Sequence, residues 1–247
     1  MRNRSLNKMA LLFTSILMLS PLSNATDFDF NNQTRAKYDL ARDQLSKGPE
    51  VVSLVNITAG MTVLDIFGGG GYYSEIIADK VGDSGKVYLH NNQAYLPYIE
   101  KELVARLKDN RLENVVRYDR EAGDLALSHN QFDIAFHILG YHDLYHKTDG
   151  WDVDKDSFLK QLLPAIKQGG KLVIVDHSAI EGSKTKHSQD LHRIDKQYVI
   201  DELKEYGLTL TVDSDLLINE KDTRLVSPFK AEIRRKTDRF VLVFEKN

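Results

Sequence analysis

The feature that most constrains the fold is a run of four glycines, residues 68–71, between an apolar run and a helical pattern. Residues 61–67 (MTVLDIF) have the length and composition of a buried strand, and residues 72–81 have the spacing of a helix. Glycine allows tight turns and lets a ligand approach the backbone closely, at a high entropic cost on ordering. A helix that begins at such a loop directs free N–H groups at the ligand. The sequence therefore predicts a strand–loop–helix unit that holds a ligand.

Short apolar runs and helical patterns alternate along the rest of the chain. The expected strands are residues 86–90, 115–118, 132–139 and 171–176, and the expected helices are residues 94–108, 158–166 and 192–206. Such alternation predicts an α/β fold, a doubly wound and mostly parallel sheet with helices on both faces. Leu208, Leu210 and Val212 indicate a further strand, and residues 239–244 (RFVLVF) the last one. No helix fits between these two strands, so we expect the last strand to run antiparallel.

The N-terminal residues carry the marks of an export signal. Arg2, Arg4 and Lys8 precede an apolar run at residues 9–19, and small residues lead to Ala25. We expect residues 1–25 to be a secretory signal peptide, cleaved after Ala25, which places the mature protein in the periplasm without stable membrane insertion. The alternative is an uncleaved membrane anchor, but a bilayer requires about 20 apolar residues.

The mature chain, residues 26–247, is expected to form a single domain. Within it, residues 26–58 predict a helical N-terminal cap of two short helices, split at Gly48 and Pro49, over one end of the sheet. The chain has no cysteine, which excludes a disulfide scaffold, a thiolate metal site and a cysteine nucleophile. Its formal net charge of −3 argues against a nucleic-acid partner.

The glycine loop resembles the first motif of class I S-adenosylmethionine-dependent methyltransferases, which is an acid followed by glycines at alternate positions. Asp65 matches the acid, Gly69 and Gly71 match the later two glycines, and Phe67 replaces the first. The resemblance covers roughly residues 50–245 and implies the Rossmann-like fold of that family with S-adenosylmethionine as cofactor. Residues 48–88, with YHDLYH, LHRID and TDRFVLVFEK, are similar to an exported, largely uncharacterised subgroup of predicted methyltransferases.

The resemblance also implies a set of cofactor contacts. Asn91 falls at the end of the second strand, where the family usually has an acid for the ribose hydroxyls. Glu121, followed by Ala122, matches the acid that holds the adenine amino group. From its position in the first turn of the helix that follows the glycines, Tyr73 is expected to line the methionine end. The implied cofactor-binding residues are therefore Asp65, Phe67, Gly68, Gly69, Gly71, Tyr73, Asn91, Glu121 and Ala122.

The chemistry is expected at the carboxyl ends of the strands, where doubly wound sheets bind ligands. His142 and Asp143 follow the fourth strand, and His177 follows the fifth. Transfer to a hydroxyl or an amine of a small-molecule acceptor needs a base, and histidine is the usual one near neutral pH. We therefore expect His142 to act as the base, oriented by Asp143, with His177 as the second candidate.

Three other interpretations compete with this one. His142 and His146, with Asp176 or His177, would form an oxygen–nitrogen metal site if residues 142–146 were helical; no metal site is assigned on this basis. A nicotinamide-dependent oxidoreductase needs a third glycine at position 73 or 74, where Tyr73 and Ser74 stand. An exported binding protein that keeps the fold without the reaction is the main alternative, because S-adenosylmethionine is made in the cytoplasm.

Overall fold

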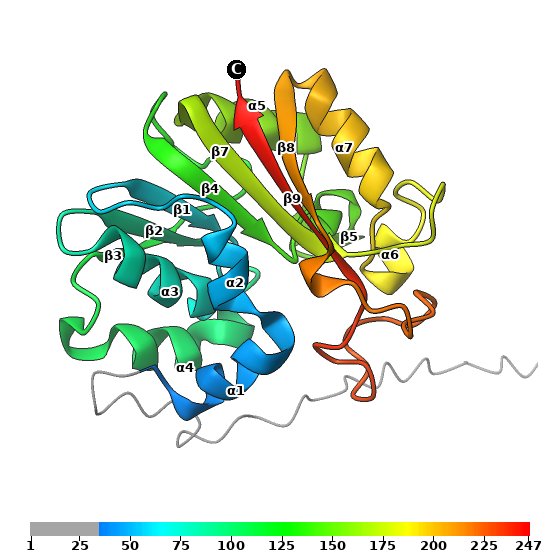
Figure 1. The fold of residues 1–247 in the computed structure, drawn as a ribbon, viewed down its shortest axis with the longest axis horizontal. Coiled ribbons are helices and arrows are strands. Elements are labelled where there is room, and N and C mark those ends of the chain that lie inside the picture. Colours follow the sequence, from blue (N-terminus) through cyan, green and yellow to red (C-terminus); the bar gives the residue numbers. More distant parts are fainter. Residues whose placement is uncertain (1–34) are drawn as a thin grey trace, which may run out of the picture.

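In the computed structural model, residues 35–247 are described, so the expected signal peptide and the cleavage site at Ala25 lie outside the described residues. The centre of the fold is a seven-stranded sheet in the order β3-β2-β1-β4-β7-β9-β8 (Figure 1). Its strands are β1 (Thr62–Ile66), β2 (Lys86–Asn91), β3 (Val115–Asp119), β4 (Phe132–Ile138), β7 (Ile166–His177), β8 (Leu208–Ser214) and β9 (Arg239–Lys246). A small hairpin of β5 (Lys147–Thr148) and β6 (Trp151–Asp152) stands apart from it.

The helices alternate with the strands as the sequence pattern predicts. They are α1 (Lys37–Ser46), α2 (Gly48–Ser53), α3 (Tyr72–Val81), α4 (Leu96–Leu107), α5 (Lys155–Ala165), α6 (Ser188–Leu191) and α7 (Lys196–Glu205). Short 3₁₀ helices lie at η2 (Lys108–Asn110), η3 (His142–Tyr145) and η4 (Asp215–Leu217). In Figure 1, α1 to α4 gather on one side of the molecule and α6 and α7 on the other.

The sheet topology confirms the predicted doubly wound fold. Strands β1, β2, β3, β4 and β7 pair in parallel, whereas β9 pairs antiparallel with both β7 and β8. The strand order reverses between β1 and β4, because β1 leads to β2 on one side and β4 to β7 on the other. In such sheets the crevice at this reversal, outside the carboxyl ends of the strands, is where ligands bind.

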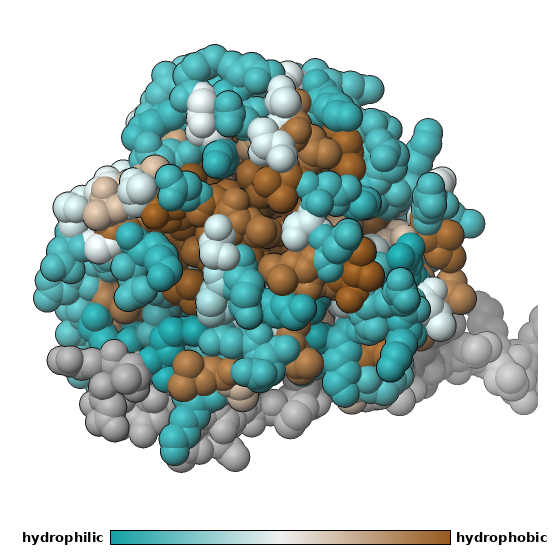
Figure 2. All heavy atoms as spheres, in the orientation of Figure 1, coloured by the Kyte–Doolittle hydropathy of each residue, from teal (hydrophilic) through white to brown (hydrophobic). Residues whose placement is uncertain are grey.

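Alternating side chains divide the core into one layer on each face of the sheet. Leu64 and Ile66 of β1 pack with α5 and α7, while Val63 packs with α2 and α3 on the opposite face. Burial on both faces explains why the central strands are continuously apolar. Figure 2 shows hydrophobic residues gathered over the middle of one face of the molecule, with hydrophilic residues around them.

The starts of two elements, β7 and α7, differ most from the sequence-based expectation. Strand β7 begins at Ile166 instead of residue 171, and its register against β4 shifts between Phe132 and Ile134, so Gly169 and Gly170 lie inside the strand instead of before it. Helix α7 begins at Lys196 instead of residue 192, because the Asp195 side chain caps it by accepting a hydrogen bond from the Gln197 N–H. The apolar spacing alone does not mark these local breaks.

The two N-terminal helices are present, with a break one residue before the expected position. Lys47 has a left-handed backbone (φ 46°) between α1 and α2, and Pro49 lies in the first turn of α2, where its missing N–H costs nothing. Asp39 of α1 pairs with Arg106 of α4, and α2 packs against α3, so both helices lie beside the glycine loop. Within residues 35–247, no helix has the length and apolar character that a membrane span requires.

Candidate functional site

The glycine loop is a strained turn between β1 and α3. Phe67, Gly69 and Gly71 all have left-handed backbones, with φ of 52°, 60° and 84°. The Gly68 N–H donates to the His90 carbonyl at 2.9 Å, which ties the turn to the end of β2. A Cβ on Gly69 would have one neighbour within 4 Å, a methyl group of Ile99 at 3.9 Å, so space is open above this residue.

Phe67 keeps the backbone conformation of a glycine although it carries a large ring. The ring is buried and stacks on Tyr95 and on Phe158, with centroid distances of 5.5 Å to each. Its edge meets Trp151 at 5.3 Å. Aromatic contacts of this kind stabilise a core beyond simple burial, and they compensate for the strain at Phe67. Its ring therefore belongs to the floor beneath the loop instead of the ligand surface.

The side chain of Asn91 is hydrogen-bonded to the glycine loop. Its side-chain oxygen accepts the Gly69 N–H and its side-chain nitrogen donates to the Gly69 carbonyl, both at 2.9 Å. The residue is completely buried. An acid at this position cannot donate to the carbonyl, which gives a physical reason for asparagine here. The expected ribose contact of Asn91 has no support in this geometry, because both polar atoms are already paired.

A buried ion network supports the loop from the other side. Arg106 of α4 donates from Nε to the Gly70 carbonyl at 2.5 Å and pairs with Asp39 at 2.8 Å. The same guanidinium pairs with Glu75 of α3 and with Glu102. Its side chain is fully buried, and three carboxylates and a carbonyl surround it. The network joins three helices to one peptide group of the loop.

Asp65 and Tyr73 lie below the loop. Asp65 is buried and accepts a hydrogen bond from the Ser74 hydroxyl at 2.6 Å, which holds the first turn of α3 against β1. Burial raises the pKa of Asp65 to about 6, although the Ser74 hydrogen bonds oppose the rise. Tyr73 is also buried and meets Tyr72 edge to face at 5.1 Å. Both residues therefore support the loop, and neither faces open space.

Glu121 lies at an open cavity beside the carboxyl end of β2. The cavity of about 280 Å³ is lined by Gln93, Asp119, Arg120, Glu121 and Asp124. The Glu121 carboxylate accepts the Gln93 N–H at 3.3 Å and the Asn92 side-chain amide at 3.4 Å. These long bonds leave its oxygens able to accept from a ligand. The neighbouring Ala122 is buried in the core, so only its backbone remains for a ligand.

His142 lies between two carboxylates at the carboxyl end of β4. Its Nδ1 is 2.7 Å from Asp176 Oδ1, its Nε2 is 3.1 Å from Asp143 Oδ1, and its backbone N–H donates to Asp176 Oδ2 at 2.8 Å. Burial alone would lower the pKa of His142, but the charges of Asp176 and Asp143 outweigh burial and raise it to about 10. The ring is therefore a cation at neutral pH, and in this state it has no lone pair with which to accept a proton.

His177, at the end of β7, lies at the same edge of the sheet. It is buried, its Nδ1 lies 2.7 Å from the Thr237 hydroxyl, and its ring centroid lies 6.1 Å from that of His142. Burial, together with the nearby positive charge of His142, lowers the pKa of His177 well below the ordinary histidine value. The two catalytic histidines expected from the sequence are thus close together but in opposite charge states.

His192 and His146 join this group, although they are distant in sequence. The His192 ring lies 5.3 Å from His142 and 4.5 Å from His146, and Phe229 covers it edge to face at 4.8 Å. A parallel bridge between Ser178 and Ile194 brings this segment to the end of β7. The expected helix 192–206 would have placed His192 on a helix, but its left-handed backbone lies before α7.

Two further aromatic residues hold Asp143, and the sequence pattern did not single out either. The Tyr95 hydroxyl donates to Asp143 Oδ2 at 2.7 Å, and the Trp151 indole donates to the Asp143 carbonyl at 2.8 Å. Trp151 is the one tryptophan of the chain. The signal in the sequence was the single tryptophan, because a buried indole N–H usually has a hydrogen-bond partner nearby.

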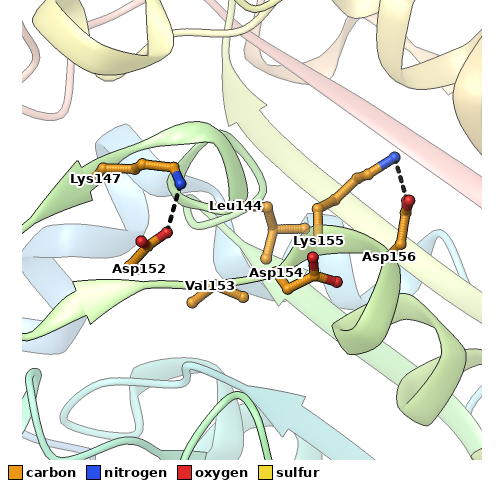
Figure 3. A pocket seen from close by; sticks show the side chains of 7 residues that line it. All are labelled: Leu144, Lys147, Asp152, Val153, Asp154, Lys155 and Asp156. Carbon is orange, nitrogen blue, oxygen red and sulfur yellow. Dashed lines mark ion pairs between the residues drawn. The ribbon is translucent and has the colours of Figure 1, made fainter.

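The larger of these two cavities is lined in part by η3, the short helix that also carries His142. Its volume is about 430 Å³, and its lining comes from η3, the small hairpin and the start of α5: Leu144, Lys147, Asp152, Val153, Asp154, Lys155 and Asp156. Figure 3 shows Lys147 paired with Asp152 on one side and Lys155 paired with Asp156 on the other. Five of these seven side chains carry charge, so the cavity suits a polar molecule.

Comparison with known proteins gives a consistent result. A family model described as a methyltransferase domain matches residues 57–223. The ubiquinone/menaquinone biosynthesis C-methyltransferase UbiE of Shewanella frigidimarina is 27% identical over 194 residues, covering 76% of this chain and 70% of that protein. The same enzyme of Shewanella sediminis is 29% identical over 187 residues, covering 73% and 68%.

Solved structures agree in fold. A SAM-dependent methyltransferase from Aquifex aeolicus has a TM-score of 0.60 at 20% identity, covering 84% of this chain and 93% of that one. An S-adenosylmethionine-dependent methyltransferase from Mesorhizobium loti has a TM-score of 0.56 at 13% identity, covering 83% of this chain and all of that one. At these identities the likeness concerns the arrangement of the sheet and helices.

Proposed function

The chain belongs to the methyltransferase domain family, and from that premise we propose that it methylates a small polar acceptor outside the cytoplasm. It is an S-adenosylmethionine-dependent methyltransferase, as its family and relatives indicate. The acceptor, its cavity, the residues of the site and the location of the protein are parts of the proposal.

The residues at the glycine loop fit the cofactor. Space is open above Gly69, and Gly71, the residue before α3, contributes no side-chain cap to this helix. We assign the open face of Gly69, whose N–H and carbonyl are already paired with Asn91, as the surface on which the cofactor packs, and the carboxylate of Glu121 as a group that accepts a hydrogen bond from it. When bound, the cofactor supplies an activated methyl group on a sulfonium.

The observation that carries the acceptor proposal is the charged cavity of about 430 Å³, which is lined in part by Leu144 of η3, the short helix that begins at His142. Its volume lies within the range of small-molecule sites, and Lys147, Lys155 and three aspartates line it. The curated relatives carry out C-methylation in ubiquinone and menaquinone biosynthesis. The charged lining favours a more polar acceptor for this chain.

The side chains at the edge of the sheet can position this acceptor. The acceptor atom has to approach the methyl group in line and at near-attack distance. Holding the two reactants in this orientation is by itself enough to accelerate methyl transfer greatly. His142, held as a cation by Asp143 and Asp176, contributes positive charge at this edge. If the acceptor loses a proton, we assign its removal to the neutral His177 instead of His142.

The decisive experiment is calorimetric titration of the full chain with S-adenosylmethionine and S-adenosylhomocysteine, followed by a screen of polar acceptors for S-adenosylhomocysteine release. Heat of cofactor binding, together with release of S-adenosylhomocysteine in the presence of one class of polar acceptor, supports the proposal. Heat without release from any acceptor would support the exported binding protein instead. Release with hydrophobic quinone precursors alone would overturn the polar assignment.

The location has its own test. The basic start, the apolar run of residues 9–19 and Ala25 support export and cleavage. Mass spectrometry of the protein recovered from its native host should find Thr26 as the first residue in the periplasmic fraction. An intact Met1 in the cytoplasm or in a membrane fraction would contradict this part of the proposal.

A further inference from the structure

We propose that His142, Asp143 and His192 form a binding site for a divalent first-row transition metal, with Zn²⁺ as its simplest occupant. Each residue offers one ligand atom, and these atoms lie within 4.8 Å of one another. His142 is buried and the other two are partly exposed, so the site combines a fixed wall with access from solvent. Because a metal binds the deprotonated imidazole nitrogen, an ion at His142 Nε2 would take the place of the proton that the ring carries between the two carboxylates.

The spacing of the ligand atoms suits a tetrahedral ion. Metal–ligand bonds of about 2.1 Å place two ligand atoms of a tetrahedral site roughly 3.4 Å apart. Asp143 Oδ1 lies 3.1 Å from His142 Nε2 and 3.5 Å from His192 Nδ1. Small adjustments would therefore bring all three atoms to bonding distance of one ion. Three ligands leave a fourth position free for water or for an anionic oxygen or sulfur.

The residues behind the ligands hold them as in metal sites. His142 Nδ1 faces the buried Asp176 carboxylate at 2.7 Å, which directs Nε2 toward the site. Asp143 Oδ2 accepts from the Tyr95 hydroxyl at 2.7 Å, which leaves Oδ1 for the ion. Hydrogen bonds of this kind, from the histidine ring to a carboxylate and from a hydroxyl to the ligating carboxylate, orient ligands and raise metal affinity.

The His192 ring is held by its neighbour in sequence. Arg193 is fully buried and donates to the carbonyls of Ser178 and Val226, at 3.0 and 2.9 Å, and to the Asp222 carboxylate. This anchoring fixes the left-handed backbone of His192 at the end of β7. The imidazole thus faces Asp143 from a rigid segment and not from a free loop.

Polar atoms without partners point to a missing group. Within residues 35–247, the buried Nδ1 atoms of His192 and His146 have no hydrogen-bond partner at ordinary distance. Buried polar atoms are normally paired, and unpaired ones mark an absent water or ion. A metal at His192 Nδ1 would satisfy the first. The His146 ring, which is tilted against the His192 ring at a centroid distance of 4.5 Å, would confine it.

The test is titration of the untagged, chelator-treated full chain with Co²⁺, read through the visible d–d absorption bands, and then displacement of Co²⁺ by Zn²⁺. We expect intense bands of a low-coordinate nitrogen–oxygen site at one equivalent. His192→Ala, which removes a partly exposed ligand, should weaken binding by about 100-fold or more, because loss of an orienting residue alone costs 10- to 100-fold.

Two comparisons keep the result interpretable. His129→Ala removes an exposed histidine elsewhere and should leave the Co²⁺ bands unchanged. Asp143→Asn should weaken binding while circular dichroism shows a native fold, which separates metal loss from unfolding. Absence of the bands in the wild-type chain, or equal affinity in His192→Ala and wild type, would overturn the proposal and leave a hydrogen-bonded charge cluster.

Discussion

At the scale of single residues, the main result is that the residue type at the end of a strand does not determine the protonation state of its side chain. His142 has the position expected of a base, yet the carboxylates on both sides make it a cation. His177, one strand away, is neutral because burial dominates there. The sequence could place both residues at the same edge, but it could not say that Asp176 would face His142.

The raised pKa of His142 predicts a pH dependence of stability. The group binds its proton more tightly in the folded chain, so its contribution to the free energy of unfolding is complete below the unfolded pKa and is lost as pH rises through the folded value. The loss should extend from about pH 6.5 to about pH 10. Urea unfolding across this range should show a decline in wild type that is much smaller in His142→Gln.

The matched control for this measurement is His129→Gln, since His129 is exposed. Its free energy of unfolding should decline with pH as in wild type. If the free energy of unfolding had the same slope against pH in wild type and in His142→Gln, the imidazole would titrate alike in the folded and unfolded chains.

A second prediction at this scale concerns Asn91. Asn91→Asp removes the donor to the Gly69 carbonyl and sets a carboxylate against that carbonyl in a buried place. Loss of one buried hydrogen bond partner costs about 1–3 kcal/mol, and the added charge increases it. Urea unfolding measures this cost, and cofactor affinity should fall with it.

This outcome is opposite to what the family pattern suggests, because an acid facing the ribose would tighten binding. Asn110→Asp, at an exposed asparagine, serves as the control and should change neither quantity. Tighter cofactor binding in Asn91→Asp would show that the side chain leaves Gly69 when the ligand arrives.

At the scale of elements, the apolar periodicity and the glycine positions predict most of the helices and strands. Helix α3 spans the expected residues 72–81, and the start of β4 was also expected correctly. The errors fall where side chains act locally, at the Asp195 cap of α7 and at the shifted register near Gly169. The Arg106 network could not be foreseen, because its partners come from three helices.

That network leads to a prediction about the helices around the loop. Arg106→Leu leaves the buried carboxylate of Asp39 without its cation and frees the Gly70 carbonyl. Removal of one partner of a buried ion pair costs about 3–5 kcal/mol. Urea unfolding should therefore show a large loss. Arg117→Leu, which breaks a partly exposed pair with Glu100, should cost less than about 1 kcal/mol.

At the scale of the whole molecule, the strand order reverses between β1 and β4, so a cofactor bound in the crevice at this reversal would contact both halves of the sheet. A ligand that binds the folded chain alone stabilises it globally, by about 2.7 kcal/mol at 100 times its dissociation constant. S-Adenosylhomocysteine should produce this increment in urea unfolding. Glu121→Ala should reduce the increment if its carboxylate contacts the adenine, whereas Tyr98→Ala, at an exposed ring, should preserve it.

The position of β9 has a consequence for how the chain is made. Strand β8 reaches the rest of the sheet through β9, which pairs with β7 on its other side. During synthesis from the N-terminus, residues 208–214 emerge before residues 239–246. The backbone groups of β8 therefore lack their pairing strand, β9, until the end of the chain has been made. Its alternating Thr209, Thr211 and Asp213 make it a poor template for other chains during that interval. From this chain order we expect the sheet to be completed late, when β9 pairs between β7 and β8.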